Sequence, residues 1–235
     1  MTETGQIICG DSRELLAGVV ADAANPIIVT DPPFNVGYHY DCYADKMAED
    51  EYYDMLSDIF APCPFVVIHY PEAIYRIAVR TNRCPDRVVS WVYNSNTPRQ
   101  HRDVGYFGVS PCFDGMGEYK NPTDRRIAQR IAAGKKAKGY DWLYCDQVKN
   151  VSKKSTDARP CMMPLKVMLY VVGSLPEDAT IIDPFAGSGT TLLAAKRLGR
   201  KYCGIEISSA YCRKIESRLA NDSPLFDFET GNQEY

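Results

Sequence analysis

The stretch ATIIDPFAGSGTTLLAAKRLG, residues 179–199, decides the fold class. A short β-branched run ends at Asp183, and the glycine-rich turn FAGSGT follows it directly. The next residues space their apolar side chains by three and four, as an amphipathic helix does, and Gly199 ends the pattern. A strand, a glycine turn and a helix in this order predict one crossover unit of a parallel α/β sheet.

The glycine turn has the composition of a site for a nucleotide cofactor. Gly187 and Gly189 permit close backbone approach and positive φ angles, and the following helix begins with unpaired N–H groups. The turn lacks G-K-[ST] and the G-x-G-x-x-G spacing, which excludes a phosphate-binding P-loop and the dinucleotide fingerprint. Glu206 ends the next apolar run, nineteen positions after Gly187, where a carboxylate suits ribose hydroxyls. The alternative is a glycine turn that binds no ligand.

Apolar strand-like runs alternate with helical patterns along most of the chain. The strand-like runs are NPIIVTD, PFVVIHY, RVVSWVY, ATIIDPF and KYCGIEI, and the helical patterns are AEDEYYDMLSDIF, PEAIYRIAVRT, PLKVMLYVVGSL and TTLLAAKRLG. This alternation predicts an α/β fold with a doubly wound, mostly parallel sheet that is covered on both faces. The predicted divisions are 1–94 and 159–220 for two halves of one domain, 95–158 for an insertion, and 221–235 for a flexible tail.

The composition excludes several classes of protein. A hydrophobic fraction of 45% and a charged fraction of 24% are typical of a soluble globular chain. No apolar run approaches the length of a membrane helix, and the first residues do not resemble a secretion signal. The nine cysteines form no C-x-x-C pair, so we expect no metal site and no disulfide framework, but reduced thiols in a cytoplasmic protein. Three histidines, none beside a G-x-S-x-G elbow, argue against a hydrolase.

Positive charge is concentrated in one part of the chain. The whole sequence has a net charge of -3, but residues 120–166 contain twelve Lys or Arg and four Asp, which gives +8 there and -11 elsewhere. Within this part, TDRRIAQRIAAGKKAK predicts a short basic helix with Asp124 near its start. The asymmetry indicates a polyanion bound on one face, and the alternative is a solvated basic surface.

A second unusual strand end lies in VTDPPFNVGYHY, residues 29–40. An apolar run ends in Asp31, two prolines and Phe34, a combination that no hydrophobic core requires. Taken alone, the prolines could simply end the strand while Asp31 caps a turn.

Together, DPPF and DPFAGSGTT resemble the motifs of the S-adenosylmethionine-dependent DNA amino-methyltransferases, which act on N6 of adenine or N4 of cytosine. The catalytic motif comes first here, 152 residues before the cofactor motif, and this order resembles the beta group of the family. CGDSRELL and RVVSWVYNSNTP are also similar to family segments. ARPCMMPLKVMLYVVGS departs from the family's pattern at Arg159, Met162 and Met163.

The resemblance implies a Rossmann-like methyltransferase fold of permuted order. Residues 1–94 would be its catalytic half, 95–158 its target-recognition region and 159–220 its cofactor half. The implied catalytic residues are Asp31, Pro32, Pro33 and Phe34. The implied cofactor residues, for S-adenosyl-L-methionine, are Asp11, Asp183, Pro184, Phe185, Ala186, Gly187, Ser188, Gly189, Thr190, Glu206 and Ile207. The expected DNA-binding residues are Arg99, Arg102, Arg125, Arg126, Lys135, Lys136, Lys138, Lys153 and Lys154, and Asn94, Asn96 and Gln100 join Arg99 and Arg102 as candidates for base reading.

The implied reaction explains the residues of DPPF. An exocyclic amino group is a poor nucleophile because its lone pair is delocalised into the ring. The Asp31 carboxylate and the Pro32 carbonyl would accept its two N–H groups, and Phe34 would stack on the base. The base must leave the duplex to reach them, and Tyr38, Tyr40 and Tyr43 are candidates for a lid.

Several alternatives remain open at this point. Asp31 favours adenine over cytosine, whose enzymes more often begin the motif with Ser. RNA or a protein glutamine also presents an NH₂ group, although glutamine enzymes carry Asn-Pro-Pro after the cofactor motif. A non-catalytic DNA-binding protein on the same fold is a further alternative. Double-stranded DNA is the expected partner, and a homodimer and a cognate restriction endonuclease are weaker expectations from the family.

Overall fold

Eight strands form one sheet in the computed structural model, which describes residues 5–37, 45–148 and 162–221. Their order across the sheet is β1-β8-β7-β2-β3-β5-β4-β6. The strands are β1 (Gly5–Cys9), β2 (Pro26–Thr30), β3 (Phe65–His69), β4 (Arg87–Val92), β5 (His101–Phe107), β6 (Trp142–Tyr144), β7 (Thr180–Asp183) and β8 (Lys201–Glu206). All neighbours are parallel except β5, which is antiparallel to both β3 and β4.

The sheet reverses its winding direction between β7 and β2. From β7 the chain crosses through α6 (Thr190–Arg197) to β8 on one side, whereas from β2 it crosses through α2 (Glu49–Phe60) to β3 on the other. β2 and β7 are themselves paired, with Ile28 opposite Ile182. The carboxyl ends of two such strands flank the place where open α/β sheets bind their ligands. The predicted doubly wound, mostly parallel fold is confirmed.

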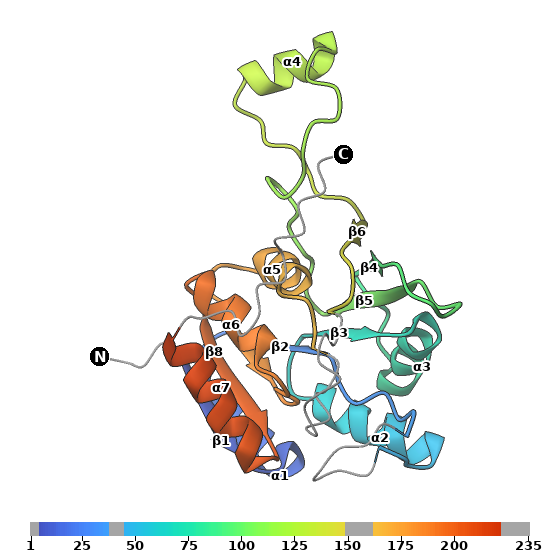
Figure 1. Cartoon of the computed structure of the whole chain (residues 1–235), viewed down its shortest axis with the longest axis vertical. Coiled ribbons are helices and arrows are strands. Elements are labelled where there is room, and N and C mark those ends of the chain that lie inside the picture. The colour runs from blue at the N-terminus through green and yellow to red at the C-terminus, as the bar shows by residue number, and fades with distance from the viewer. Residues whose placement is uncertain (1–4, 38–44, 149–161, 222–235) are drawn as a thin grey trace.

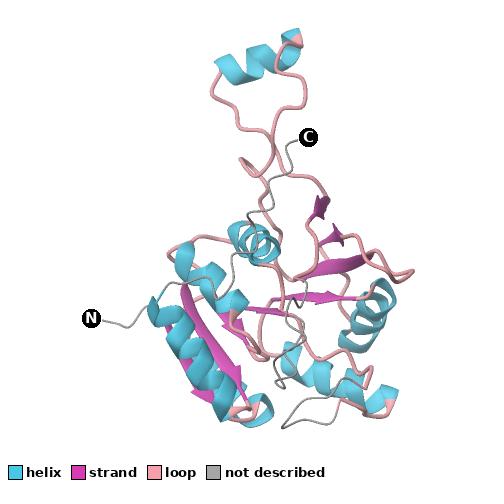
Figure 2. Cartoon of the chain, in the orientation of Figure 1, coloured by secondary structure: helices cyan, strands magenta, loops and turns pink. Residues whose placement is uncertain are grey.

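Helices cover both faces of the sheet and make two separate cores (Figure 2). Ile27 and Val29 of β2 pack on one face with α5, α6 and α7, whereas Ile28 packs on the other face with α1, α2 and α3. This alternation follows from the period of two in a strand. The helices are α1 (Ser12–Asp22), α2 (Glu49–Phe60), α3 (Pro71–Thr81), α4 (Arg125–Ala132), α5 (Leu165–Gly173), α6 (Thr190–Arg197) and α7 (Ser209–Asn221).

The sheet extends into the region that the sequence assigned to an insertion from residue 95. β5 lies between β3 and β4 and pairs along its whole length, so the body continues at least to residue 107. The sequence of β5 does not show a clear strand pattern, because its first residues are polar and Gly105 interrupts the apolar run. A Cβ at position 105 would lie 2.7 Å from the Phe107 side chain, so close packing requires the glycine.

An arm, which we define as residues 114–138, carries α4 away from the sheet, as Figure 1 shows. The predicted basic helix is confirmed, and Asp124 is its N-cap, accepting hydrogen bonds from the N–H groups of Arg126 and Ile127. No residue of α4 is buried. At the base of the arm, the backbones of Asp114 and Lys138 form an isolated antiparallel β-bridge. The predicted tail falls almost entirely on residues 222–235, which lie outside the described structure.

Candidate active site

The glycine turn joins β7 to α6 at the carboxyl edge of the sheet. Gly187 and Gly189 have φ angles of 52° and 76°, which non-glycine residues adopt rarely. A Cβ at position 189 would also lie 2.9 Å from the Ile215 side chain. Gly189 is the N-cap of α6, and no side chain of the described structure caps this helix. The turn therefore lies at the positive end of a helix, with Gly187 and Ser188 partly exposed and Gly189 buried.

Glu206 connects the end of β8 to the glycine turn. Its Oε2 accepts from the Gly187 N–H at 2.8 Å, and its Oε1 accepts from the Ser208 N–H at 2.9 Å. Burial raises the pKa of Glu206, and these backbone hydrogen bonds oppose the rise. The Ile207 N–H also bonds this carboxylate, which has about four acceptor positions, so about one remains for a ligand. The neighbouring Ile207 is an exposed apolar side chain.

Asp183 locks the tip of β7 to the tip of β2. Its buried Oδ1 accepts from Thr30 Oγ1 at 2.7 Å and from the Phe185 N–H at 3.1 Å. Burial raises the pKa of Asp183 to about 6, and hydrogen bonds from Thr191 and Thr30 oppose this rise. The described hydrogen bonds of Asp183 are thus to groups of the protein itself. Its predicted contact with a cofactor stays a prediction.

The end of β1 lies against the same turn. Asp11, which the resemblance placed beside an adenine ring, caps α1 by accepting from the Arg13 N–H at 2.9 Å. The Arg13 side chain also binds this carboxylate, and this contact lowers the pKa of Asp11. Next to it, Ser12 Oγ donates to the Pro184 carbonyl. The described contacts of Asp11 are local, and its role toward a ligand stays a prediction.

Asp31 follows β2 and lies next to Asp183. Its Oδ1 is buried and has no hydrogen-bond donor. Arg102 Nη1 is 3.8 Å from this oxygen, an ionic contact that is too long for a hydrogen bond. Burial raises the pKa of Asp31 to about 6, the positive charge of Arg102 opposes the rise, and the negative charge of Asp183 adds to it. A buried acceptor without a donor is costly unless another molecule supplies one.

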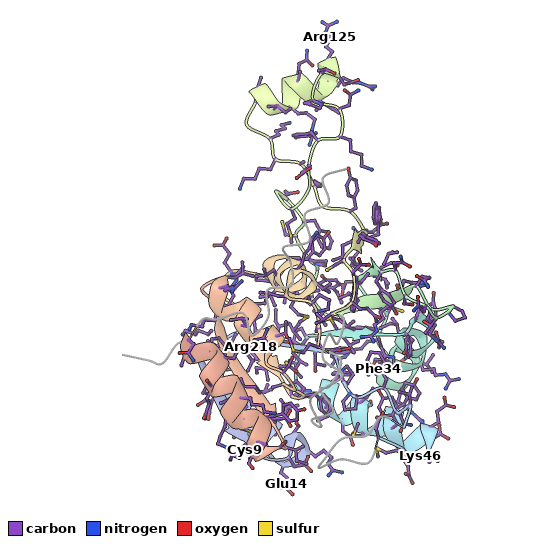
Figure 3. All side chains as sticks on the ribbon, in the orientation of Figure 1. Cys9, Glu14, Phe34, Lys46, Arg125 and Arg218 are labelled. Carbon is purple, nitrogen blue, oxygen red and sulfur yellow. The ribbon has the colours of Figure 1, made fainter. Side chains whose placement is uncertain are left out.

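Phe34 lies at the surface of this site, not in the core, and Figure 3 labels it in the body of the chain. Its ring stacks on His69 with centroids 4.2 Å apart and an interplanar angle of 19°. Tyr70 meets it edge-on at 4.9 Å. The Arg102 guanidinium lies over the same ring, with Cζ 4.6 Å from the centroid. Aromatic and planar cationic groups therefore already gather on the ring that was predicted to hold a base.

A chain of hydrogen bonds fixes the DPPF backbone through His69. Burial lowers the pKa of His69 to about 3, with Arg102 contributing, so the ring is neutral near pH 7. The Tyr70 N–H donates to Nδ1 at 2.8 Å, which leaves the proton on Nε2. Nε2 therefore donates to Tyr52 Oη at 2.9 Å, and the Tyr52 hydroxyl donates to the Pro33 carbonyl at 2.7 Å.

Sequence reasoning missed the roles of His69 and Tyr52. One signal was present, because His69 is a polar residue at the carboxyl end of a buried strand, where ligand sites gather. The Pro33 carbonyl is bonded internally, and the predicted role of the Pro32 carbonyl toward a base stays a prediction.

Hydrogen bonds join the two ends of the loop that follows DPPF. Asp45 accepts from the N–H groups of Asn35 and Val36 at 2.8 and 3.1 Å, and Asn35 has a φ angle of 57°. The Asn35 side chain bonds the backbone of Met47 in both directions. The predicted lid residues Tyr38, Tyr40 and Tyr43 fall between these ends and lie outside the described residues.

A family model described as DNA methylase matches residues 90–217, which is more than half of the chain. The chain belongs to the N6/N4 DNA methylases. The match runs from β4 to α7 and includes the glycine turn and Glu206.

Individual relatives extend the match over the whole methylase body. The DNA adenine methyltransferase YhdJ of Escherichia coli K12 is 26% identical, over 92% of this chain and 83% of the relative. The crystal structure of an M1.HpyAVI–SAM complex superposes with a TM-score of 0.60 at 19% identity, covering 92% of this chain and 99% of the other. The cytosine-N4-specific PvuII DNA methyltransferase gives a TM-score of 0.62 at 18% identity, covering 95% of each chain. At these identities the two structures establish the shared fold.

The predicted DNA-binding residues of the methylase lie in two different settings. Arg125, Arg126, Lys135, Lys136 and Lys138 are exposed on the arm, and Figure 3 labels Arg125 at its far end. Arg99 pairs with Glu72 and lies over the Tyr70 ring next to Phe34, whereas the Arg102 side chain is only 11% exposed. Lys153 and Lys154 lie outside the described residues.

Within the described part of the methylase, no group of three or more His, Cys, Asp or Glu side chains is arranged to hold a metal ion. No helix there has both the length and the apolar character that crossing a membrane requires.

Proposed function

We propose that this methylase transfers a methyl group from S-adenosylmethionine to the exocyclic N6 of an adenine flipped out of DNA. The observation that carries the proposal is the buried Asp31 Oδ1, which lacks a donor and lies at the strand tip beside the glycine-turn strand. Adjacent tips of β2 and β7 bring an acceptor for an amino group close to a turn with the features of a cofactor site.

The residues of the glycine turn suit a nucleoside cofactor. Gly187 and Ser188 are partly exposed at the turn, and Glu206 keeps acceptor capacity for ribose hydroxyls. The exposed Ile207 offers an apolar surface for an adenine ring. When bound, S-adenosylmethionine supplies an electrophilic methyl group on a sulfonium.

Asp31 and Pro32 act on the attacking nitrogen. Their oxygens accept its two N–H groups and favour a tetrahedral nitrogen whose lone pair points at the methyl carbon. Because positive charge develops on this nitrogen in the transition state, an ionised Asp31 stabilises that state more than the ground state. The contact from Tyr52 to the Pro33 carbonyl holds the loop in position, and this contributes by orientation. The N–C bond forms as the S–CH₃ bond breaks and S-adenosylhomocysteine leaves, and the methylated nitrogen, an acidic ammonium, gives its extra proton to water.

The modified base is the point that an experiment must decide. DNA from cells that express the chain, sequenced by a method that detects methylated bases, should carry N6-methyladenine at one recurring sequence. The same DNA from cells that express the Asp31→Asn variant is the control. N4-methylcytosine in place of N6-methyladenine would establish the alternative specificity, and DNA without new methylation would refute the proposal.

Removing the Glu206 side chain is expected to weaken cofactor binding. Each lost hydrogen bond to this charged acceptor contributes about 1.5–3 kcal/mol, so the Kd for S-adenosylmethionine should rise at least about tenfold in Glu206→Ala. Titration calorimetry measures the change. Glu177→Ala removes a carboxylate from the opposite edge of the sheet, just before β7, and should bind the cofactor normally. An unchanged Kd in Glu206→Ala would refute the ribose contact.

The rate of methylation is expected to fall in acid below about pH 6. Asp31, whose pKa is raised to about 6, accepts an N–H group only when it is ionised. Protonation of the free enzyme therefore lowers kcat/KM for DNA about tenfold for each pH unit below this pKa. Initial rates between pH 5 and 8 at constant ionic strength test this, and a flat profile would show that ionised Asp31 is not required.

A further inference from the structure

Arg102 occupies the space that the proposed reaction requires for the target base. Its side chain starts on β5 and reaches the carboxyl end of β2, where Nη1 lies 3.8 Å from Asp31 Oδ1. Its Cζ lies 4.6 Å from the Phe34 ring centroid and 5.4 Å from that of Trp91. With 11% of the side chain exposed, Arg102 does not have the surface position of a phosphate-binding arginine.

The guanidinium has the properties by which a target base would be held. It is planar, it stacks on aromatic rings and it carries N–H donors in its plane. A base amino group would need to lie about 2.7–3.2 Å from an Asp31 oxygen while its ring covers Phe34. The guanidinium fills this space but completes only part of the bonding, because Asp31 Oδ1 still lacks a hydrogen-bond donor.

We propose that Arg102 holds the place of the target base in the DNA-free methylase and is displaced by the flipped base. This inference rests on the proposed function. Without DNA, the guanidinium covers Phe34 and compensates the charge of Asp31. During methyl transfer the attacking nitrogen becomes positive, and a guanidinium kept beside Asp31 would repel that charge. The same residue must therefore leave for Asp31 to act on the base.

A pocket next to the site gives the displaced side chain room. Its volume is about 530 Å³, and its lining includes Tyr70, Tyr93, Pro98, Arg99, Gln147 and Arg102 itself. Arg99 lies over the Tyr70 ring at 4.2 Å and shows that an arginine is accommodated against these aromatic side chains. A rotation of Arg102 about its own bonds into this pocket would clear Phe34 without movement of the sheet.

Trp91 provides a spectroscopic reporter of the displacement. It is buried, its Nε1 donates to the Cys145 carbonyl at 2.7 Å, and the Arg102 guanidinium lies over its ring. The chain contains two tryptophans, and the other, Trp142, is exposed on the edge strand β6. Trp142→Phe therefore leaves a single tryptophan next to the proposed moving group.

The test adds unmethylated DNA to the Trp142→Phe protein saturated with S-adenosylhomocysteine, with DNA binding followed separately by gel shift. We expect DNA to change the Trp91 emission. In Trp142→Phe/Arg102→Gln the emission without DNA should already match the DNA-bound value, and the DNA-dependent change should be lost. Trp142→Phe/Arg87→Gln, which removes an exposed arginine at the start of β4, is the matched control and should keep the change. Bound DNA that leaves Trp91 unaffected, or a change that persists without Arg102, would overturn the proposal.

A second measurement is independent of fluorescence. Arg102 on β5 and Asp183 on β7 are the charged groups that act on Asp31, and removal of the arginine leaves only the negative one. In Arg102→Gln the acid limb of kcat/KM, which reports the free enzyme, should therefore move to higher pH. The acid limb of kcat, which reports the DNA complex, should stay in place because Arg102 has already left. A shift in both limbs would show that Arg102 stays beside Asp31 during the reaction, and this would refute the displacement.

The two proposals fail in different ways. Methyl transfer by the Trp142→Phe protein is measured with tritiated S-adenosylmethionine on the same DNA. Transfer with an unaffected Trp91 signal would reject only the displacement of Arg102, whereas bound DNA without any transfer would reject the proposed function.

Discussion

Asp31→Asn is expected to lower the rate of methyl transfer by about 100-fold or more while S-adenosylmethionine binds normally. Asparagine has nearly the same shape, but it replaces a charged acceptor by a neutral carbonyl and an NH₂ donor. Loss of one group aimed at developing charge typically lowers kcat by about 100- to 1,000-fold. Single-turnover transfer of tritiated methyl groups measures the rate, and titration calorimetry measures cofactor affinity.

The fold should survive this substitution, which makes the result interpretable. Asparagine keeps the shape of Asp31 and creates no cavity, and the lower cost of burying a neutral side chain offsets the loss of the 3.8 Å ionic contact with Arg102. Asp22→Asn, at the exposed end of α1, is the matched control and should transfer methyl groups at the normal rate. Full activity in Asp31→Asn, or a loss of cofactor affinity as large as the loss of rate, would contradict the role given to Asp31.

The sequence was sufficient to predict that the two motifs meet. Asp31 and Asp183 are 152 residues apart, but each ends an apolar run that is followed by turn residues, and the ends of parallel strands share one edge. In the structure the two strands are paired neighbours, and Thr30 donates to Asp183 across them. Local signals succeed here because strand ends, glycine turns and amphipathic helices are each encoded within a few residues.

The setting of Arg102 could not be predicted in the same way. From the sequence it is one of several basic residues in a polar region, and we expected it to contact DNA. Only the pairing of β5, with Asp103 opposite His69 and Arg102 opposite Trp91, brings its side chain to the catalytic loop. His69 is similar, since its neutral state and its bonds depend on Tyr52 and on burial by distant elements. The surroundings of both residues depend on how strands far apart in the sequence pair with one another. A short window of sequence does not contain this information.

Replacing Lys135, Lys136 and Lys138 together by glutamine is expected to weaken DNA binding by about 100-fold near physiological salt. These side chains are exposed on the arm, and among them Lys138 is 3.3 Å from Asp114 in a pair exposed to solvent. Each phosphate contact contributes a slope of about 0.9 to the dependence of log affinity on log salt, so the slope should fall by up to about 2.7. Fluorescence anisotropy with labelled duplex between about 50 and 200 mM salt measures both quantities.

A change of net charge alone must be separated from the loss of local contacts. Lys201→Gln/Arg213→Gln/Lys214→Gln removes the same three charges from exposed positions on β8 and α7, away from the arm in Figure 1. Long-range attraction would weaken alike in both triple variants, but the salt slope counts only the counterions that bound phosphates release. A reduced slope in the arm variant and a normal slope in the control therefore locate the DNA on the arm. Equal salt slopes in the two variants would show that DNA binds to another face of the methylase.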